Sequence, residues 1–394
     1  MTSTLAYVFT ALLVSLIGTE PPSTISAEPP PIIIAEPPDY ITINLGDIWP
    51  VDINDHGEIL AIANDDTNTA LIWHDHTTIT EIGPNLEVEA INNVGQVVGQ
   101  SADGIPFIWD GNFTYLQPQT IGKALDVNDS GVIVGWYDTA NGRCGAVWES
   151  NGYHCYNPLS SSSCWRPRLI NNNGHIAGYW GEGDPYHFSP CWFWDGITLT
   201  HISAVCQLGA MNDHGDIVAT TLAGDDYLFL WNEKGITFLQ YESNVCEVII
   251  KPVGISDNED IVAEFLYFGN GCPIGMRRIR LWHENQMHTM TELITPCLLD
   301  IYPEYVQAMN TNGWFVGLGL QRLDRRYCGF LMRPRPSGDA NCDGEVDYYH
   351  DYRYFPACMM SPESAPECVL LDTDKDGDID LIDYAALQNA YTGF

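Results

Sequence analysis

The chain between residues 40 and 335 repeats one pattern of apolar and polar positions seven times. In each copy an apolar residue precedes a four-residue polar turn, another apolar residue stands two positions after the turn, and a small residue stands four positions after it. The turn reads Asn-x-x-Gly in six copies and Ser-Asp-Asn-Glu in the remaining one. The turns begin at Asn54, Asn92, Asn128, Asn171, Asn212, Ser256 and Asn310.

The position four residues after each turn is Ala or Gly in every copy, which indicates that something bulky approaches the strand there. These small residues are Ala61, Gly99, Gly135, Gly178, Ala219, Ala263 and Gly317. A tryptophan follows six of the seven turns and is the expected neighbour, whereas Met332 takes this place in the last copy. The tryptophans are Trp73, Trp109, Trp148, Trp194, Trp231 and Trp282.

Each unit of about 40 residues predicts a strand, the polar turn, a second strand, a tryptophan strand and a final short strand. The seventh unit stops after its third strand, at Gly329 to Met332, and Tyr40 to Leu45 forms a strand with no unit of its own. If this first strand completes the last unit, every unit has four strands and the array closes into a ring without free edges. The sequence therefore predicts an all-β fold, a seven-bladed β-propeller over residues 40–332.

The turn residues themselves are expected to have a structural role. The Asn side chain can bond the main chain two residues on, and Gly accepts a positive φ. The repeat, with Ala90-Ile-Asn-Asn-Val-Gly-Gln-Val-Val-Gly99 followed by Phe107-Ile-Trp-Asp-Gly111, also resembles the HAF family of extracellular repeats. That resemblance implies export and a propeller-like array, and it implies no particular reaction.

A calcium-binding loop is predicted near the C-terminus, between Asp372 and Asp383. Carboxylates occupy loop positions 1, 3, 5, 9 and 12, Gly377 stands at position 6, and position 7 provides its main-chain carbonyl. Six aspartates this close repel one another by about 1 kcal/mol per pair even in water, unless a cation gathers them. The expected Ca²⁺ ligands are Asp372, Asp374, Asp376, Asp378, Asp380 and Asp383.

A similar loop lies earlier in the chain, with the expected ligands Asp339, Asn341, Asp343, Glu345 and Asp347. In this first loop position 12 is His350, whose nitrogen suits a hard cation poorly, and Asp351 follows directly. Asp351 can take this place if the loop rearranges. Without that rearrangement the first loop should bind Ca²⁺ less tightly than the second, and His350→Asp should tighten it.

The duplicated loop and helix resembles the dockerin type I module, most clearly in Gly377-Asp-Ile-Asp380 and Asp383-Tyr-Ala-Ala-Leu-Gln388. The resemblance implies a small α-helical Ca²⁺-binding domain over residues 339–394, after a Pro-rich linker at 333–338, that docks onto a cohesin-like or other cell-surface protein. Many dockerins carry Ser-Thr at loop positions 10 and 11, where this chain has Tyr348-Tyr349 and Leu381-Ile382.

Export is predicted at the N-terminus. The apolar run from Leu5 to Gly18 is too short to span a bilayer and resembles a secretory signal peptide over residues 1–27, although no Lys or Arg precedes it. A Pro-rich spacer follows at 28–39. The twelve cysteines include no Cys-x-x-Cys pair and so favour disulfides. We expect Cys191–Cys206 and Cys272–Cys297 each within one blade, Cys358–Cys368 in the C-terminal region, and Cys328 to be bonded as well. We therefore expect a secreted or cell-surface protein.

Composition narrows the function further. Sixteen basic and 52 acidic side chains give a net charge of −36, which repels nucleic-acid phosphates, and no later segment is apolar enough for a membrane span. The favoured interpretation is a non-catalytic binding and assembly protein, with a polysaccharide as one ligand of the propeller. The rival is a carbohydrate-active enzyme, of polysaccharide lyase or glycoside hydrolase type, which would need paired carboxylates with shifted pKa values in the central funnel. The sequence nominates no catalytic residue.

Overall fold

A computed structural model describes the chain from residue 39 to residue 391. The gaps within this range are 76, 157–164, 182–188, 222–226, 240–246, 268–276, 285, 294–300, 344, 360–365 and 376–377. The predicted signal peptide, all of the spacer but Asp39, and the pair Cys272–Cys297 lie outside the described residues. No helix in the described part combines the length and the apolar character needed to cross a membrane.

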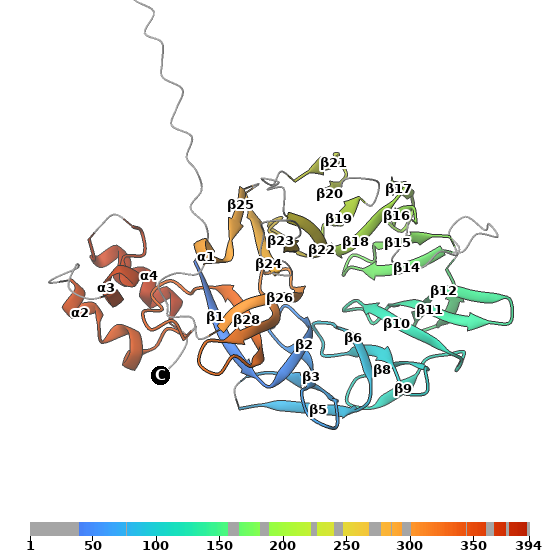
Figure 1. The fold of residues 1–394 in the computed structure, drawn as a ribbon, viewed down its shortest axis with the longest axis horizontal. Helices are drawn as coiled ribbons and strands as arrows, with labels where there is room; N and C mark the ends of the chain where they lie inside the picture. Colours follow the sequence, from blue (N-terminus) through green and yellow to red (C-terminus); the bar gives the residue numbers. More distant parts are fainter. Residues whose placement is uncertain are drawn as a thin grey trace, which may run out of the picture. The chain divides into compact units, whose positions relative to one another are not determined.

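Seven antiparallel four-stranded sheets stand around a common axis, as the sequence predicted (Figure 1). We number the sheets as blades in chain order. Blades 1 to 3 are β2 (Ile48–Ile53), β3 (Ile59–Ala63), β4 (Thr69–Trp73) and β5 (Ile79–Pro84); β6 (Glu87–Ile91), β7 (Val97–Gln100), β8 (Pro106–Trp109) and β9 (Phe113–Tyr115); and β10 (Gly122–Val127), β11 (Ile133–Thr139), β12 (Gly142–Glu149) and β13 (Gly152–Cys155).

The remaining blades repeat the same order of strands. Blades 4 to 6 are β14 (Trp165–Ile170), β15 (Ile176–Trp180), β16 (Cys191–Trp194) and β17 (Leu199–Ser203); β18 (Cys206–Met211), β19 (Ile217–Thr221), β20 (Leu228–Asn232) and β21 (Gly235–Phe238); and β22 (Glu247–Ile255), β23 (Ile261–Tyr267), β24 (Arg277–His283) and β25 (Gln286–Thr289). Blade 7 contains β26 (Ile301–Met309), β27 (Phe315–Gln321), β28 (Tyr327–Pro334) and β1 (Tyr40–Gly46).

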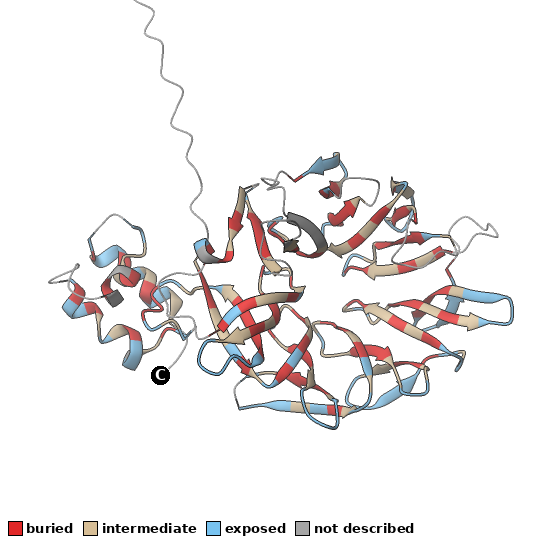
Figure 2. Cartoon of the chain, viewed as in Figure 1, coloured by how far each residue is buried: buried red, intermediate tan, exposed pale blue. Residues whose placement is uncertain are grey.

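The ring closes as predicted, because β1 pairs with β28 in antiparallel register from Tyr40 opposite Pro334 to Gly46 opposite Gly329. The first strand of the chain is thus the outer strand of the last blade. The middle strands of each blade are buried between neighbouring blades, whereas outer strands such as β9, β13 and β21 are largely exposed (Figure 2).

The repeated Asn residues join the blades to one another. The Asn92 Oδ1 accepts hydrogen bonds from the main-chain N–H groups of Val94 and Gln96 in its own turn, and its Nδ2 donates to the Asn128 carbonyl of the next blade at 2.9 Å. The same donation runs from Asn54 to Asn92, Asn128 to Asn171, Asn171 to Asn212, Asn212 to Ser256 and Asn310 to Asn54. In the exceptional sixth turn the N–H of Asp257 bonds the Thr311 carbonyl instead. The turn residues are therefore structural, as expected.

The innermost strand of every blade has a β-bulge at the same place. There one residue of the innermost strand has no pairing partner on the second strand of the blade. The extra residues are Val51, Glu89, Leu125, Arg168, Gly209, Val253 and Gln307. We expected a tryptophan to lie against the small residue four positions after each turn, and the structure corrects this. A Cβ at Gly99, Gly135 or Gly317 would collide with a carbonyl oxygen of the innermost strand, not with a tryptophan.

Disulfides join Cys144 to Cys155, Cys191 to Cys206 and Cys358 to Cys368. The last two were predicted, but Cys191–Cys206 links β16 of blade 4 to β18 of blade 5, whereas we expected it within one blade. Cys328, also expected to be bonded, is a buried free thiol.

After β28 the described residues form a π-helix, η1 (Tyr348–Tyr352), and the α-helices α2 (Phe355–Cys358), α3 (Pro366–Leu371) and α4 (Leu381–Ala390). Another short helix, α1 (Met290–Leu293), follows β25. The helical region has its own apolar core, which includes Val346, Phe355, Leu371, Ile379 and Leu387. Val346 and Ile379 are the aliphatic residues at position 8 of the two acidic loops.

Closure by β1 yields a stability prediction. Deleting residues 28–46 should lower the melting temperature of the propeller sharply, because the deletion exposes the edge of β28 and removes the buried side chains of Tyr40 and Ile41. Deleting 28–38 alone keeps β1 and should leave the melting temperature unchanged. Calorimetry that finds both deletions as stable as the parent would contradict closure by this strand.

Candidate functional site

The second acidic loop gathers three of its predicted ligands. Carboxylate oxygens of Asp372, Asp374 and Asp383 all lie within 4.8 Å of one another. Asp383 is buried: its Oδ1 accepts hydrogen bonds from the N–H and the hydroxyl of Thr373, and its Oδ2 accepts the N–H of Asp380. Asp376 lies outside the described residues. The loop thus brings together carboxylates that would repel one another without a cation.

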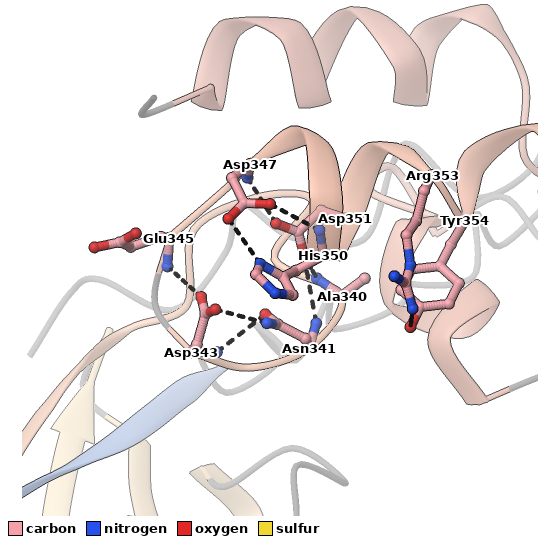
Figure 3. Close-up of polar contacts among 9 residues, drawn as sticks. All are labelled: Ala340, Asn341, Asp343, Glu345, Asp347, His350, Asp351, Arg353 and Tyr354. Carbon is pink, nitrogen blue, oxygen red and sulfur yellow. Dashed lines mark hydrogen bonds and ion pairs between the residues drawn. The ribbon is translucent and has the colours of Figure 1, made fainter. Parts of the chain in front are cut away.

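The first loop has the same arrangement around Asp351 (Figure 3). Asp351 is fully buried, its Oδ1 accepts the N–H of Ala340 at 2.8 Å, and its Oδ2 accepts the N–H of Asp347 at 2.7 Å. Ala340 and Thr373 are both position 2 of their loops, and Asp347 and Asp380 are both position 9. Asp351 is therefore the structural equivalent of Asp383.

His350 does not take this place. It is exposed, and its Nδ1 lies 2.8 Å from the Asp347 Oδ2. The first loop is one residue longer than the second, and the π-helix η1 accommodates the extra residue where α4 begins as a regular helix. The rearrangement that the sequence left open is the one that the structure contains.

The two buried carboxyls differ electrostatically. Burial raises the pKa of Asp351 against the hydrogen bonds from Asp347 and Ala340. Burial also opposes ionisation of Asp383, but hydrogen bonds from Asp380 and Thr373 outweigh it and lower the pKa of that carboxyl. The Thr373 hydroxyl supplies a bond that Ala340 cannot.

Large apolar side chains are exposed beside both loops, at positions 10 and 11. Leu381 is 72%, Ile382 60% and Tyr349 66% exposed.

The propeller contains a second candidate site, which we call the axial cavity. It has a volume of about 440 Å³ and is lined by the innermost strands of all seven blades. The seven bulge residues line it, as do Asp52, Asp126 and Lys251. Bulges redirect side chains and are common beside active sites. Here they present Glu89, Arg168 and Gln307 to the axis.

Two aspartates in the axial cavity have strongly shifted pKa values. Burial raises the pKa of Asp52 to about 7, against a hydrogen bond from the Ile91 N–H and with the charge of Asp126 adding to the rise. Burial likewise raises the pKa of Asp126 to about 6, against hydrogen bonds from the N–H groups of Ile170 and Val127 and the charge of Arg168. Both side chains are partly exposed and line the cavity.

These cavity residues were not predicted. The side chains come from innermost strands about 40 residues apart, and no local motif marks a bulge. The one available signal is a charged residue two or three positions before an Asn-x-x-Gly turn, as in Asp52 and Arg168.

Aromatic residues on second strands differ in their exposure. Tyr137 and Tyr179 are buried between blades. Trp180 is 44% exposed and stacks on Trp165 with a centroid separation of 5.3 Å. The side chains of Tyr267 and Phe268 lie outside the described residues.

No protein-family model and no curated protein matches this chain. Among solved structures, an oligogalacturonate lyase in complex with manganese has a TM-score of 0.51 at 9% identity, over 76% of this chain and 92% of the lyase. A prolyl endopeptidase aligns with a TM-score of 0.48 at 7% identity over 75% of this chain, which spans only 50% of that protein. The WD40 β-propeller domain of Doa1 aligns with a TM-score of 0.42 at 13% identity, over 76% of this chain and 98% of the domain. At these identities the likeness concerns the propeller fold alone.

The raised pKa of Asp52 predicts a pH-dependent stability. Because the folded-state value of about 7 lies above the ordinary 3.8, this group stabilises the fold fully below about pH 4, and the contribution is lost as pH rises through 7. Asp52→Asn keeps an acceptor for the Ile91 N–H and removes the titration. The unfolding free energy of the variant minus that of the parent should therefore rise by about 1.4 kcal/mol per pH unit between pH 4 and pH 7.

Urea unfolding at several pH values measures this difference. Asp66→Asn, at an exposed position of the propeller, should follow the parent at every pH. An Asp52→Asn curve that stays parallel to the parent would contradict the shifted titration.

Proposed function

We propose that this chain is a secreted, non-catalytic binding and assembly protein, whose propeller is attached to its place of action through a Ca²⁺-dependent C-terminal module. The observation that carries the proposal is the equivalence of Asp351 and Asp383, each buried and bonded to positions 2 and 9 of its own loop. The dockerin resemblance and the disulfides, which suit an oxidising compartment, support it.

Calcium fits the donors that the two loops offer, since it prefers several carboxylate, amide and carbonyl oxygens. Asp372, Asp374 and Asp383 would hold one ion together with Asp376, Asp378 and Asp380. Asp339, Asn341, Asp343, Glu345, Asp347 and Asp351 would hold the other. Each ion would offset the repulsion within its loop and so stabilise the helices that flank it.

The exposed side chains of Leu381, Ile382 and Tyr349 would form the docking surface for a cohesin-like or other cell-surface protein. They directly follow the position 9 residues, so Ca²⁺ binding would order the backbone that presents them. The partner would contribute an apolar face, because no charged side chain occupies loop positions 10 and 11.

Calcium titration of the full chain tests the module. Calorimetry should find two sites in the parent and one in Asp383→Asn or Asp351→Asn, because each variant loses the charge of one buried carboxylate. His350→Gln should keep both sites, as should the exposed control Asp66→Asn. Saturating Ca²⁺ at about 100 times its dissociation constant should stabilise the module by about 2.7 kcal/mol. Two sites in Asp351→Asn, or one in His350→Gln, would refute the assignment.

A second candidate function is a carbohydrate-active enzyme on the propeller. One observation favours it: Asp52 and Asp126 line the axial cavity with pKa values of about 7 and 6. A carboxyl poised near neutrality can donate or accept a proton at physiological pH, as general acid–base catalysis requires.

Turnover of a polysaccharide panel by the full chain decides between these candidates. If the enzyme proposal holds, Asp126→Asn should lower the rate by about 10²- to 10⁴-fold. Lys234→Gln, an exposed change outside the cavity, should leave the rate unaltered. The absence of turnover on every polysaccharide, with binding retained, would support the non-catalytic proposal.

A further inference from the structure

The acidic and the basic residues that line the axial cavity come from different blades. Asp52, Glu89 and Asp126 belong to the consecutive blades 1, 2 and 3, whereas Arg168 and Lys251 belong to blades 4 and 6. Gly209 of blade 5 lies between the two cations in the ring order and adds no side chain. One wall of the cavity is therefore acidic and the facing wall is basic.

The two cations of the basic wall have no carboxylate partner in the described part of the chain. Arg168 makes one long hydrogen bond, to the Leu125 carbonyl at 3.5 Å. Nearby basic groups differ, since Lys123 pairs with Glu89 at 2.6 Å and Arg277 with Glu264 at 3.0 Å. In a protein with 16 basic and 52 acidic residues, two half-buried cations that make no ion pair with the described residues favour a ligand that neutralises them.

Lys251 is surrounded by charges of both signs. Burial lowers the pKa of Lys251, the carboxylates of Glu264 and Glu89 oppose this, and the charges of Arg168 and Arg277 lower it further. An anion placed between Lys251 and Arg168 would relieve that repulsion.

The carboxylates of the acidic wall already have hydrogen-bond or ion-pair partners. Asp52 and Asp126 accept main-chain N–H groups from neighbouring blades, and Glu89 is paired with Lys123. What remains are carboxyl oxygens that can bond hydroxyl groups but would repel a second negative charge. A dianion such as phosphate is therefore a poor fit, and a monoanion with a hydroxyl-bearing body is a good one.

We propose that the axial cavity binds a sugar acid, with its carboxylate between Arg168 and Lys251 and its hydroxyl groups facing Asp52 and Asp126. The volume of about 440 Å³ lies within the roughly 300–1,000 Å³ typical of small-molecule sites. Arg presents a planar pair of donors that matches a carboxylate, and Lys adds a point charge. Such binding requires neither Ca²⁺ in the C-terminal loops nor any catalysis in the cavity.

Calorimetric titration of the full chain with D-glucuronate tests this, with D-glucose and inorganic phosphate as comparison ligands. Glucuronate should bind and glucose should not. Arg168→Gln and Lys251→Gln should each weaken binding roughly ten- to hundredfold, because each removes a charged hydrogen-bond donor. Arg168→Lys should lose less, and the exposed control Lys234→Gln should bind like the parent. Melting curves would verify that each variant is folded.

The ionisation of Lys251 provides a readout that a merely structural role would not change. In dimethyl-lysine NMR spectra its pKa should rise when glucuronate is added and stay constant when glucose is added. Equal binding of glucose, binding of phosphate alone, or glucuronate affinity unchanged in both Gln variants would overturn the proposal. So would binding of an α-amino acid in place of glucuronate, since that would assign the acidic wall to an ammonium group.

Discussion

Hydrogen bonds from an Asn side chain to the main chain of the next blade join neighbouring sheets at six of the seven junctions of the ring. At the seventh junction a main-chain bond from Asp257 to Thr311 takes their place. A sheet must bury its apolar face against another element, so the blades depend on one another. Each Asn is buried and uses both ends of its amide, the oxygen within its own turn and the nitrogen on its neighbour. Aspartate supplies only the oxygen, which explains why an amide recurs at this position.

The β-bulge in the innermost strand also recurs in all seven blades, and it determines which side chains face the axis. It places one unpaired residue per blade at the axis, and it requires a small residue on the adjacent strand because a carbonyl oxygen lies against it. Since the bulge residue makes no ladder contact, its identity affects the fold little. A repetitive scaffold can therefore present a non-repetitive set of side chains, here Glu89, Arg168 and Gln307.

The C-terminal region combines repetition and variation in a similar way. Two copies of one loop surround a buried aspartate with the same main-chain donors, although one copy is a residue longer. The π-helix η1 absorbs the difference, because an extra residue in a helical turn widens that turn without moving the residues on either side. The geometry of the loop is thus maintained and the helix start is altered.

The sequence alone determined the features that arise from neighbouring residues and from chain order. The period of the Asn-x-x-Gly turns predicted seven blades, the strand count at the two ends predicted closure by β1, and the acidic spacing predicted two similar loops, the first of them less regular. The sequence left open whether His350 or Asp351 completes the first loop, because that choice depends on how a helix packs. It also placed Cys191–Cys206 within one blade, since spacing in the chain does not reveal where one sheet ends. The axial cavity was decided only by the tertiary structure. Asp52, Asp126, Arg168 and Lys251 are far apart in the chain, and only ring closure and the bulges bring them to one axis. There burial raises the pKa values of Asp52 and Asp126 and lowers the pKa of Lys251.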